Sequence, residues 1–431
     1  MLVSLSLETI LVLIVSKIIY FYRFSNVKVF VRLQKNLIYF IILDLIIINL
    51  IKLSHMRNSV VVFLLFLTSC LYSQSYTQNT YGGILSELYF ERMPSAKSEA
   101  MGRGSAANTD GNFGSFSNPA LTSLNNGFTF NTSFSRPYYI WDDAKYNYFG
   151  LSYTDKKLGS FSLSRYHWTI GPIIITNETG AEIGTTNDYN RSLYTLNYSR
   201  EIIKDLYGGL NITMNEIVLP YTSDFTLGKT TNTAFSLDFG LLKRFEFPSP
   251  VNKNLLHTFQ LGGTIYNVTG TKIKPDVDVY TTPLPSILRL AGSYNMKLKG
   301  NLIVPNTNDI ELLSHLEYEN VVNATSDFKF IIKFGQEITI GDLFSLRAGY
   351  FSQKINNHGN PDIESSFSQF TYGAGLKIPL STIFKMRNPL SLSIDYVNLK
   401  QPTALTTLNV DKFNTISFNL NFNPFPVTLQ H

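Results

Sequence analysis

The sequence is poor in charge and almost free of cysteine. Only 16% of its 431 residues are charged, and Cys70 is the only thiol. An average soluble domain carries roughly 25% charged residues. A single cysteine excludes an intramolecular disulfide and any metal site built from several thiolates. The chain is rich instead in aromatic residues, with 32 Phe and 25 Tyr, and its length allows either two or three domains or one large all-β unit.

The formal net charge of +5 comes entirely from the N-terminal part of the chain. Lys and Arg number 36 and Asp and Glu number 31, but seven of the basic and two of the acidic residues precede residue 74. From there on, 29 basic residues balance 29 acidic ones. A nucleic-acid-binding domain normally carries a basic stripe. The neutral balance therefore argues against a nucleic-acid partner.

Residues 1–55 contain no Gly, Ala or Pro. Their two apolar runs, 10–22 and 37–51, include one charge each, Lys17 and Asp44. Both runs are shorter than the roughly 20 residues that a membrane-spanning helix needs. We interpret residues 1–55 as translated sequence upstream of a true start at Met56. An N-terminal membrane segment is the alternative.

Residues 56–73 have the layout of a signal peptide. Arg57 is the positive n-region, residues 60–67 are the apolar h-region, and small residues follow up to Ser73. Cleavage after Ser73 would remove Cys70 and leave a mature chain without a thiol. The alternative is a lipobox at 67–70, with a lipid on Cys70. Both interpretations predict export from the cytoplasm.

From residue 127 to residue 424, apolar and aromatic residues recur at every second position. In one such set Phe235, Leu237 and Phe239 alternate with Ser236 and Asp238, which predicts a strand with one oily and one polar face. The fourteen strands predicted in this way centre on residues 128–134, 149–153, 161–163, 194–198, 210–214, 235–241, 259–265, 288–296, 310–318, 328–334, 344–350, 370–376, 390–396 and 416–422.

An even number of strands, joined alternately by short and long connections, is typical of an outer-membrane barrel. We expect long loops at 171–190, 219–232 and 354–366. The fold class predicted for residues 127–431 is therefore all-β, a transmembrane antiparallel β-barrel of about fourteen strands. A secreted sandwich or propeller would show the same alternation, but the aromatic content and the lack of a 40–50-residue repeat favour the barrel. Trp141 and Trp168 are predicted in an interfacial girdle.

Residues 74–126 do not alternate and are dominated by Gly, Ala, Ser and Asn. A fourteen-stranded barrel has a wider lumen than an eight-stranded one, which side chains alone can fill. We therefore predict that residues 74–126 form a plug inside the barrel. The alternative is a flexible periplasmic tail.

Three short motifs precede the first predicted strand: Pro-Ser-Ala-Lys at 94–97, Ala-Met-Gly at 100–102 and Asn-Pro-Ala at 118–120. In this order they resemble the FadL superfamily of outer-membrane barrels and, within it, the PorV/PorQ family, whose first motif usually ends in Arg where Lys97 stands here. Residues 284–294, 346–350 and 372–376 are similar to strands of the same family. The plug residues that the resemblance singles out are Pro94, Met101, Gly102, Gly104, Asn118, Pro119 and Ala120.

The resemblance implies two different functions. PorV/PorQ-like barrels are accessory components of type IX protein secretion in the Bacteroidota, with secretion components or exported cargo as partners. FadL-like barrels take up hydrophobic molecules such as long-chain fatty acids through the hatch and a side opening in the wall. The short mature chain favours the secretion role, and the hydrophobic channel is the alternative. Both imply a barrel surrounded by outer-membrane lipid.

The sequence shows little sign of catalytic chemistry. None of the six His residues has a partner at a metal-ligand spacing, and no local Ser–His pair is present. We expect no enzyme activity, no metal and no cofactor. Charged residues on the polar faces of the strands are expected to be mostly solvated. Arg289, Arg347 and Asp395 are the candidates for contacts within the lumen.

Overall fold

The computed structural model describes residues 92–108, 110–136, 144–177, 179–187, 189–223, 226–250, 252–273, 282–300, 307–322, 328–356, 364–400 and 412–424. The predicted upstream segment 1–55, the signal peptide 56–73 with Cys70, the first part of the predicted plug (74–91) and Trp141 lie outside these residues. None of the described helices is long and apolar enough to cross a membrane.

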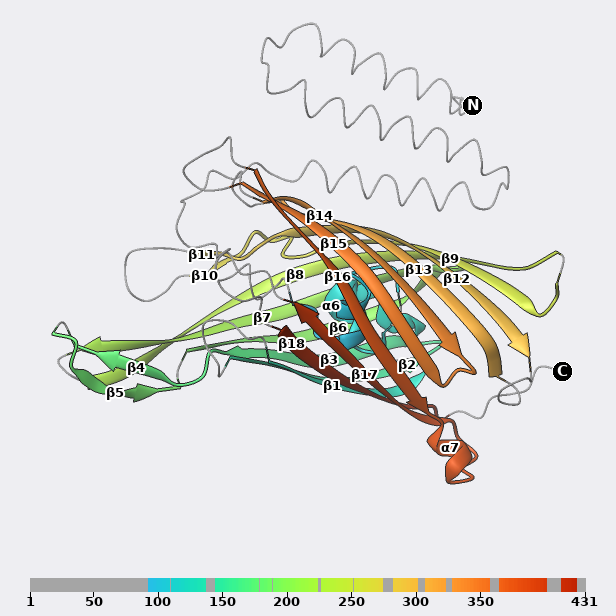
Figure 1. Ribbon diagram of the computed structural model, residues 1–431, viewed down its shortest axis with the longest axis horizontal. Coiled ribbons are helices and arrows are strands. Elements are labelled where there is room, and N and C mark those ends of the chain that lie inside the picture. Colours follow the sequence, from blue (N-terminus) through green and yellow to red (C-terminus); the bar gives the residue numbers. More distant parts are fainter. Residues whose placement is uncertain are drawn as a thin grey trace, which may run out of the picture. The chain divides into compact units, whose positions relative to one another are not determined.

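Fourteen antiparallel strands close into a barrel (Figure 1). Its strands are β1 (Gly127–Arg136), β2 (Lys145–Asp155), β3 (Gly159–Thr169), β6 (Asn190–Ile203), β7 (Leu206–Ser223), β8 (Thr226–Pro248), β9 (Leu255–Ile265), β12 (Ile287–Gly300), β13 (Thr307–Val321), β14 (Phe328–Ile340), β15 (Phe344–Asn356), β16 (Glu364–Ile378), β17 (Leu390–Lys400) and β18 (Lys412–Phe422). Each strand pairs with its neighbour in the chain, and β1 pairs with β18, with Phe128 opposite Phe422, to close the sheet.

Each of the fourteen predicted strands corresponds to one barrel strand, so the predicted fold class is confirmed. The two faces of the wall are inverted relative to a soluble protein. On β2 the outward side chains of Phe149 and Leu151 are 53% and 49% exposed, while Ser152, facing inward, is 1% exposed. An apolar exterior around a polar interior is the arrangement of a membrane-spanning barrel. The sandwich alternative, which needs an oily interior, is excluded.

The predicted long loop at 219–232 is wrong. Strands β7 and β8 continue to Ser223 and Thr226 and pair up to the turn between them. Pro220 lies just beyond Val218, the last residue of β7 that pairs with β6. The last residues of β7 therefore have one edge without a strand partner, a position at which proline is tolerated.

The other two predicted long loops are partly ordered as strand. The connection at 171–190 contains a hairpin of β4 (Ile173–Thr176) and β5 (Glu182–Thr186). Strands β15 and β16 extend into the loop predicted at 354–366, so that only residues 357–363 separate them. A further hairpin, β10 (Lys272–Ile273) with β11 (Thr282–Pro283), lies between β9 and β12.

The connections at the opposite end of the barrel are mostly tight. Strands β14 and β15 turn through Gly341 and Asp342, both with positive φ. The exception is the β16–β17 connection, which carries the short helix α7 (Leu380–Ile383).

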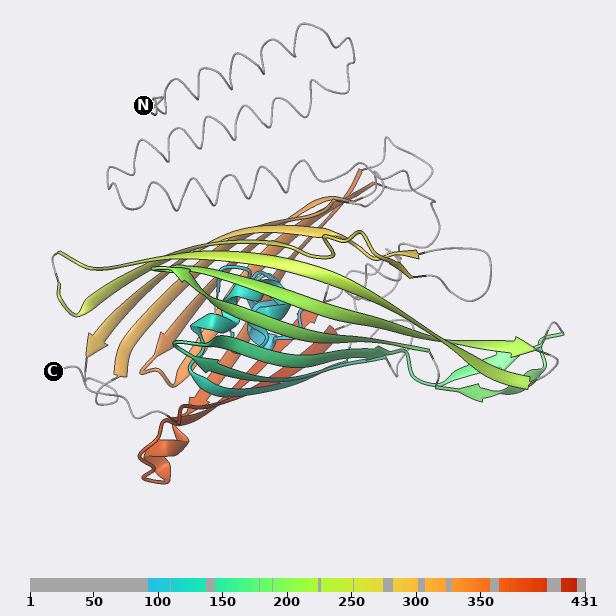
Figure 2. The ribbon, with the colours of Figure 1, turned by 180° about the vertical axis from the view of Figure 1, so that it is seen from behind.

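Residues 92–126 lie inside the barrel, and we call them the plug (Figure 2). They form helix α5 (Ala96–Ala100), helix α6 (Gly114–Ser117) and the 3₁₀ helix η1 (Pro119–Leu124). Helix α5 packs against β15 to β18, whereas η1 packs against β3 and β6 to β8 on the other side. For these residues the structure excludes the flexible-tail alternative.

Candidate functional site

The first plug helix is capped by the Pro-Ser-Ala-Lys motif. Ser95 is the N-cap of α5, and its side chain accepts a hydrogen bond from the backbone N–H of Ser98 (3.3 Å). The Ser95 hydroxyl donates in turn to Asp110. Pro94, directly before the cap, is buried, and Ala96 is tied to β18 because its N–H donates to the Ser417 hydroxyl (3.2 Å). The motif therefore both starts the helix and fixes it to the wall.

The Ala-Met-Gly motif lies where the plug backbone touches the barrel wall. Met101 is completely buried. Gly102 has φ +68°, and a side chain there would lie closer than 3.0 Å to the carbonyl oxygens of Phe334 and Tyr350. Its N–H donates to the Thr371 hydroxyl (3.0 Å), which donates to the carbonyl of Ala100 (2.8 Å). Glycine is therefore required at 102 both by conformation and by space.

Gly104 lies against the buried ring of His315, which leaves no room for a side chain. Directly after it, the backbone N–H groups of Ser105 and Ala106 both donate to one carboxylate oxygen of Glu317, at 2.9 and 2.8 Å. Glu317 is 1% exposed. A buried carboxylate that accepts several N–H groups is a strong local attachment, and the sequence offered no sign of it.

The Asn-Pro-Ala motif joins the second half of the plug to β8. The Asn118 side chain caps η1 by accepting from the N–H of Ala120 (3.0 Å). Its amide donates to the carbonyl of Ala106 within the plug (2.9 Å) and to that of Leu241 on β8 (3.0 Å). Pro119 occupies the first helical position, which suits its fixed φ. All three residues are essentially inaccessible to solvent.

Wall glycines let the plug come this close. At each of seven lumen-facing glycines, a Cβ atom would lie closer than 3.0 Å to a plug atom. These wall glycines are Gly150, Gly209, Gly240, Gly262, Gly335, Gly349 and Gly373. They come from seven strands, β2, β7 to β9 and β14 to β16. The wall is thus hollowed on both sides of the plug to the depth of one side chain.

Arg289, one of the candidates for contacts within the lumen, lies against the plug. Its guanidinium donates to the carbonyl of Phe116 in α6 (3.1 Å) and pairs with Glu319. Lys333 bridges Glu317 (2.9 Å) and Glu319 (2.7 Å). These four charged side chains are all buried, two positive and two negative. The expectation that most lumenal charges are solvated is wrong here, because the plug fills the space that water would occupy.

A second charged group lies under α5. Arg347 pairs with Glu337 and with Asp395 (2.7 Å), and Lys97 of the plug pairs with Glu337 (3.1 Å). No hydrogen bond or ion pair of Arg347 or Asp395 to the plug is found among the described residues. The ion pairs of this group reach the plug through Glu337, which pairs with both Arg347 and Lys97.

The lumen also contains an aromatic cluster, which the sequence analysis missed. The cluster consists of Phe113, Tyr146, Tyr148, Tyr166, Trp168, Ile170 and Leu193, with Phe116, Ile173 and Tyr189 packed against it. The Tyr148 and Tyr166 hydroxyls donate to the plug carbonyls of Asn112 and Arg92, both at 3.2 Å, which shows that these side chains point inward. Trp168 is 5% exposed within this cluster, so its predicted place in an interfacial girdle is wrong.

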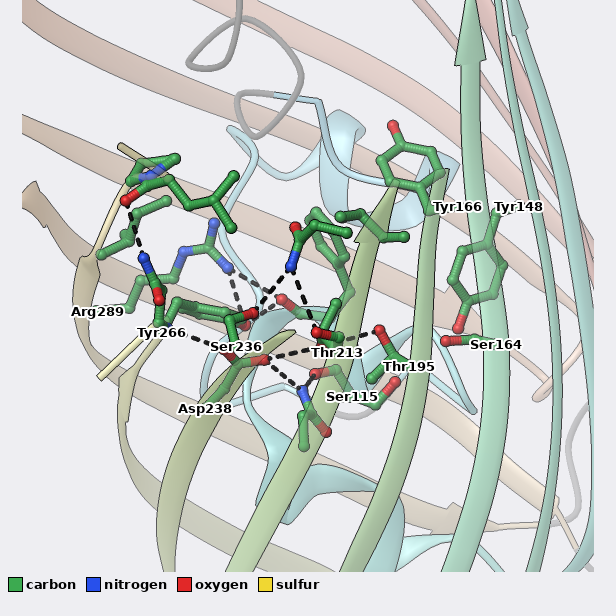
Figure 3. A pocket seen from close by; sticks show the side chains of 18 residues that line it. Ser115, Tyr148, Ser164, Tyr166, Thr195, Thr213, Ser236, Asp238, Tyr266 and Arg289 are labelled. Carbon is green, nitrogen blue, oxygen red and sulfur yellow. Dashed lines mark hydrogen bonds between the residues drawn. The ribbon is translucent and has the colours of Figure 1, made fainter. Parts of the chain in front are cut away.

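Next to the aromatic cluster lies a cavity of about 590 Å³, counting its open mouth (Figure 3). Tyr148, Tyr166 and Leu193 form an apolar side, and Asp238 and Arg289 lie on the polar side. The stretch after β9, described at 266–273 and 282–286, closes it. Tyr266 and Asn267 line one end, and Leu284, Pro285 and the first residue of β12, Ile287, line the other. Only about 30 Å³ of the space admits the centre of a water molecule, room for very few waters. Larger occupants need the plug or this stretch to move.

Asp110 gives the plug an expected pH dependence. Burial raises the pKa of Asp110 to about 6, against an opposing effect of Lys97. A carboxyl whose pKa is raised by folding contributes stability that is full below its ordinary value near 3.8 and is lost as the pH rises through 6. Protease protection of the plug should therefore strengthen from pH 7.5 to pH 4.5, by at most about 3 kcal/mol. D110N should flatten this slope. D205N, in the exposed β6–β7 turn, should keep it, and an unchanged slope in D110N would contradict the assignment.

The fold and the lumen together define a class: a membrane-spanning β-barrel of the outer-membrane type, closed by its own N-terminal plug. Among the described residues no group of His, Cys, Asp and Glu is placed to hold a metal ion. No protein-family model and no curated protein match the sequence.

Solved structures with a similar fold are outer-membrane channels. A Pseudomonas aeruginosa FadL homologue is 11% identical, covering 76% of this chain and 98% of its own, with a TM-score of 0.40. The Ralstonia pickettii toluene transporter TbuX is 11% identical over 76% of this chain and 98% of its own, TM-score 0.35. The Pseudomonas putida toluene transporter TodX is 12% identical, covering 82% of this chain and 100% of its own, with a TM-score of 0.35. These scores are too low to assign a ligand or a function to this chain.

Proposed function

We propose that this protein is a plugged outer-membrane channel of the FadL superfamily that admits small hydrophobic molecules. The aromatic cluster beside the cavity is the observation that carries the proposal. The interior of a barrel that conducts hydrophilic solutes is polar, whereas small-molecule sites are lined by apolar and aromatic side chains with a few polar groups. The lumen beside the plug has the second composition.

The cavity also adjoins a place where the described wall is not made of paired strands throughout. Strand β8 pairs with β9 only from Phe239 onward. Beyond that point the stretch after β9 covers its edge, with the N–H of Val268 donating to the carbonyl of Leu237 (2.9 Å). On this edge the Val268 N–H and the Thr271 hydroxyl, which donates to the carbonyl of Phe235 (2.7 Å), stand in place of a continuous strand ladder. The stretch is therefore the natural place for a hydrophobic molecule to leave the lumen sideways while the plug stays seated.

The secretion role was predicted from the plug motifs and from the short mature chain. The local roles of the motifs, as described above, are to cap helices and to seat the plug, and both roles serve any plugged barrel. The aromatic lumen favours the channel, so we place the secretion role second.

A matched pair of leucine variants tests the channel. Leu193 faces the cavity, and Leu163 is 60% exposed on the lipid face. L193S should reduce toluene uptake about tenfold, because a buried leucine contributes roughly 1.5–3 kcal/mol of apolar contact, while L163S should stay near wild type. Uptake is measured with radiolabelled toluene in cells that lack their own hydrophobic channel. If cells producing the wild-type barrel take up toluene no faster than cells with an empty vector, the proposed function is wrong.

A further inference from the structure

The polar side of the cavity is centred on a carboxylate that no cation neutralises directly. Asp238 lines the cavity and is 5% exposed. One of its oxygens accepts from the N–H of Asn267 (2.9 Å). The other accepts from the Asn211 amide (3.1 Å) and from the Thr213 hydroxyl (3.5 Å), which lies beside it in Figure 3. All three donors are neutral. The oxygen that Asn267 reaches has a second lone pair, so this group can accept a further hydrogen bond from a molecule in the cavity.

Arg289 is the other charged residue that lines the cavity, and its charge is already balanced. It pairs with Glu319, and Lys333 bridges Glu319 and Glu317. Two cations and two anions make this cluster neutral. Asp238 forms no ion pair within 4.0 Å among the described residues, so the net charge at the cavity is negative.

The apolar side lies across the cavity from these groups. The rings of Tyr148 and Tyr166 line this side. Their hydroxyls already donate hydrogen bonds to plug carbonyls. Leu193 adds an aliphatic surface. Once the plug or the stretch after β9 moves to make room, a molecule with an apolar body would therefore contact rings on one side and a hydrogen-bond acceptor on the other.

We infer that the cavity selects uncharged amphipathic molecules, with a small aromatic or aliphatic body and one hydroxyl, and rejects carboxylates. The inference rests on the proposed function and narrows its substrate class. A hydroxyl donates to Asp238, whereas a carboxylate meets a like charge in a site largely shielded from water, where such repulsion is strong. The positive charge of Arg289 does not offset this repulsion, because its guanidinium already pairs with Glu319.

Benzyl alcohol and benzoate form a matched pair of probes, with the same ring and opposite head groups. Binding to the purified barrel in nanodiscs is measured by saturation-transfer NMR, with protein-free nanodiscs as the blank. Wild-type protein should bind benzyl alcohol at least about tenfold more tightly than benzoate. D238N should shrink that ratio about fivefold or more. D342N, in the β14–β15 turn at the far end of the barrel, is the control and should keep the wild-type ratio, since Asn tolerates its positive φ.

The outcomes separate the two proposals. Benzoate binding as tightly as benzyl alcohol, an unchanged ratio in D238N, or no binding of either probe overturns the selectivity. If toluene uptake persists in any of these cases, the channel itself stands. Loss of toluene uptake as well would overturn the channel, and the selectivity would fall with it.

Discussion

Replacing Glu317 with alanine is expected to release the plug from the barrel wall. Both oxygens of this carboxylate are used: one accepts from Ser105, Ala106 and the His315 ring, the other from Lys333. The variant leaves two plug N–H groups without an acceptor and shifts the charge of the buried cluster toward positive. Removing one partner from a buried ion pair costs about 3–5 kcal/mol. The population of molecules with a released plug should therefore rise at least about a hundredfold.

The measurement is the rate at which a protease cuts the plug while the barrel stays folded, with barrel folding followed by its heat-dependent shift on SDS gels. Glu311 is a control on the same strand, β13. Its ion pair with Lys297 is partly exposed (3.2 Å, 17% and 33%), and such pairs contribute only about 0–1 kcal/mol, so E311A should be cut at nearly the wild-type rate. E317Q, which keeps the shape of the side chain, should fall between E317A and wild type. A plug equally protected in E317A and E311A would show that Glu317 does not hold it.

The barrel could be predicted from the sequence because its strands obey one rule. A strand in lipid must put apolar side chains on one face for its full length, so alternation persists through all fourteen. The sequence was misleading at 219–232, because Pro220 and several threonines there are residues typical of a loop. There the strands extend beyond their outer neighbours, and an unpaired edge accepts a proline that a central strand would reject.

The lumen was much harder to predict, because alternation says only that two faces differ. Tyr146 and Tyr148 share the inward face of β2 with Ser152, while Phe149 and Leu151 lie on the other face. Aromatic residues on both faces of one strand are a sign of a partly apolar lumen. The charges were misjudged for a related reason. Arg289 and Glu319 look like solvated lumen residues until the plug is known to exclude the water around them.

The plug motifs were recognised by order, but their physical roles appear only in three dimensions. The sequence could not show that Gly102 lies against Gly349, 247 positions further along the chain. Glycines at inward-facing strand positions were the available signal. Several of them on neighbouring strands indicate a backbone packed against the wall.

A substitution at Gly349 tests the opposite change to E317A, because it adds a side chain against the plug instead of removing an attractive contact. A Cβ atom at 349 would collide with the Gly102 nitrogen and the Met101 carbonyl carbon, both backbone atoms that no rotamer change can move. To make room, G349A must push the plug away from Thr371 and break the hydrogen bond from Gly102. Overpacking of this kind costs typically about 1–3 kcal/mol, and we expect the upper end because the obstacle is backbone.

The expected result for G349A is faster proteolysis of the plug together with ion conductance in planar bilayers above the wild-type level, because the displaced plug no longer fills the lumen. G292A is the matched control, since a Cβ atom there would find its nearest neighbours at 3.8 and 4.0 Å, which is ordinary contact. G349V should enlarge both effects. If G349A matches G292A in protection and in conductance, the close contact between Gly349 and Gly102 does not hold the plug closed.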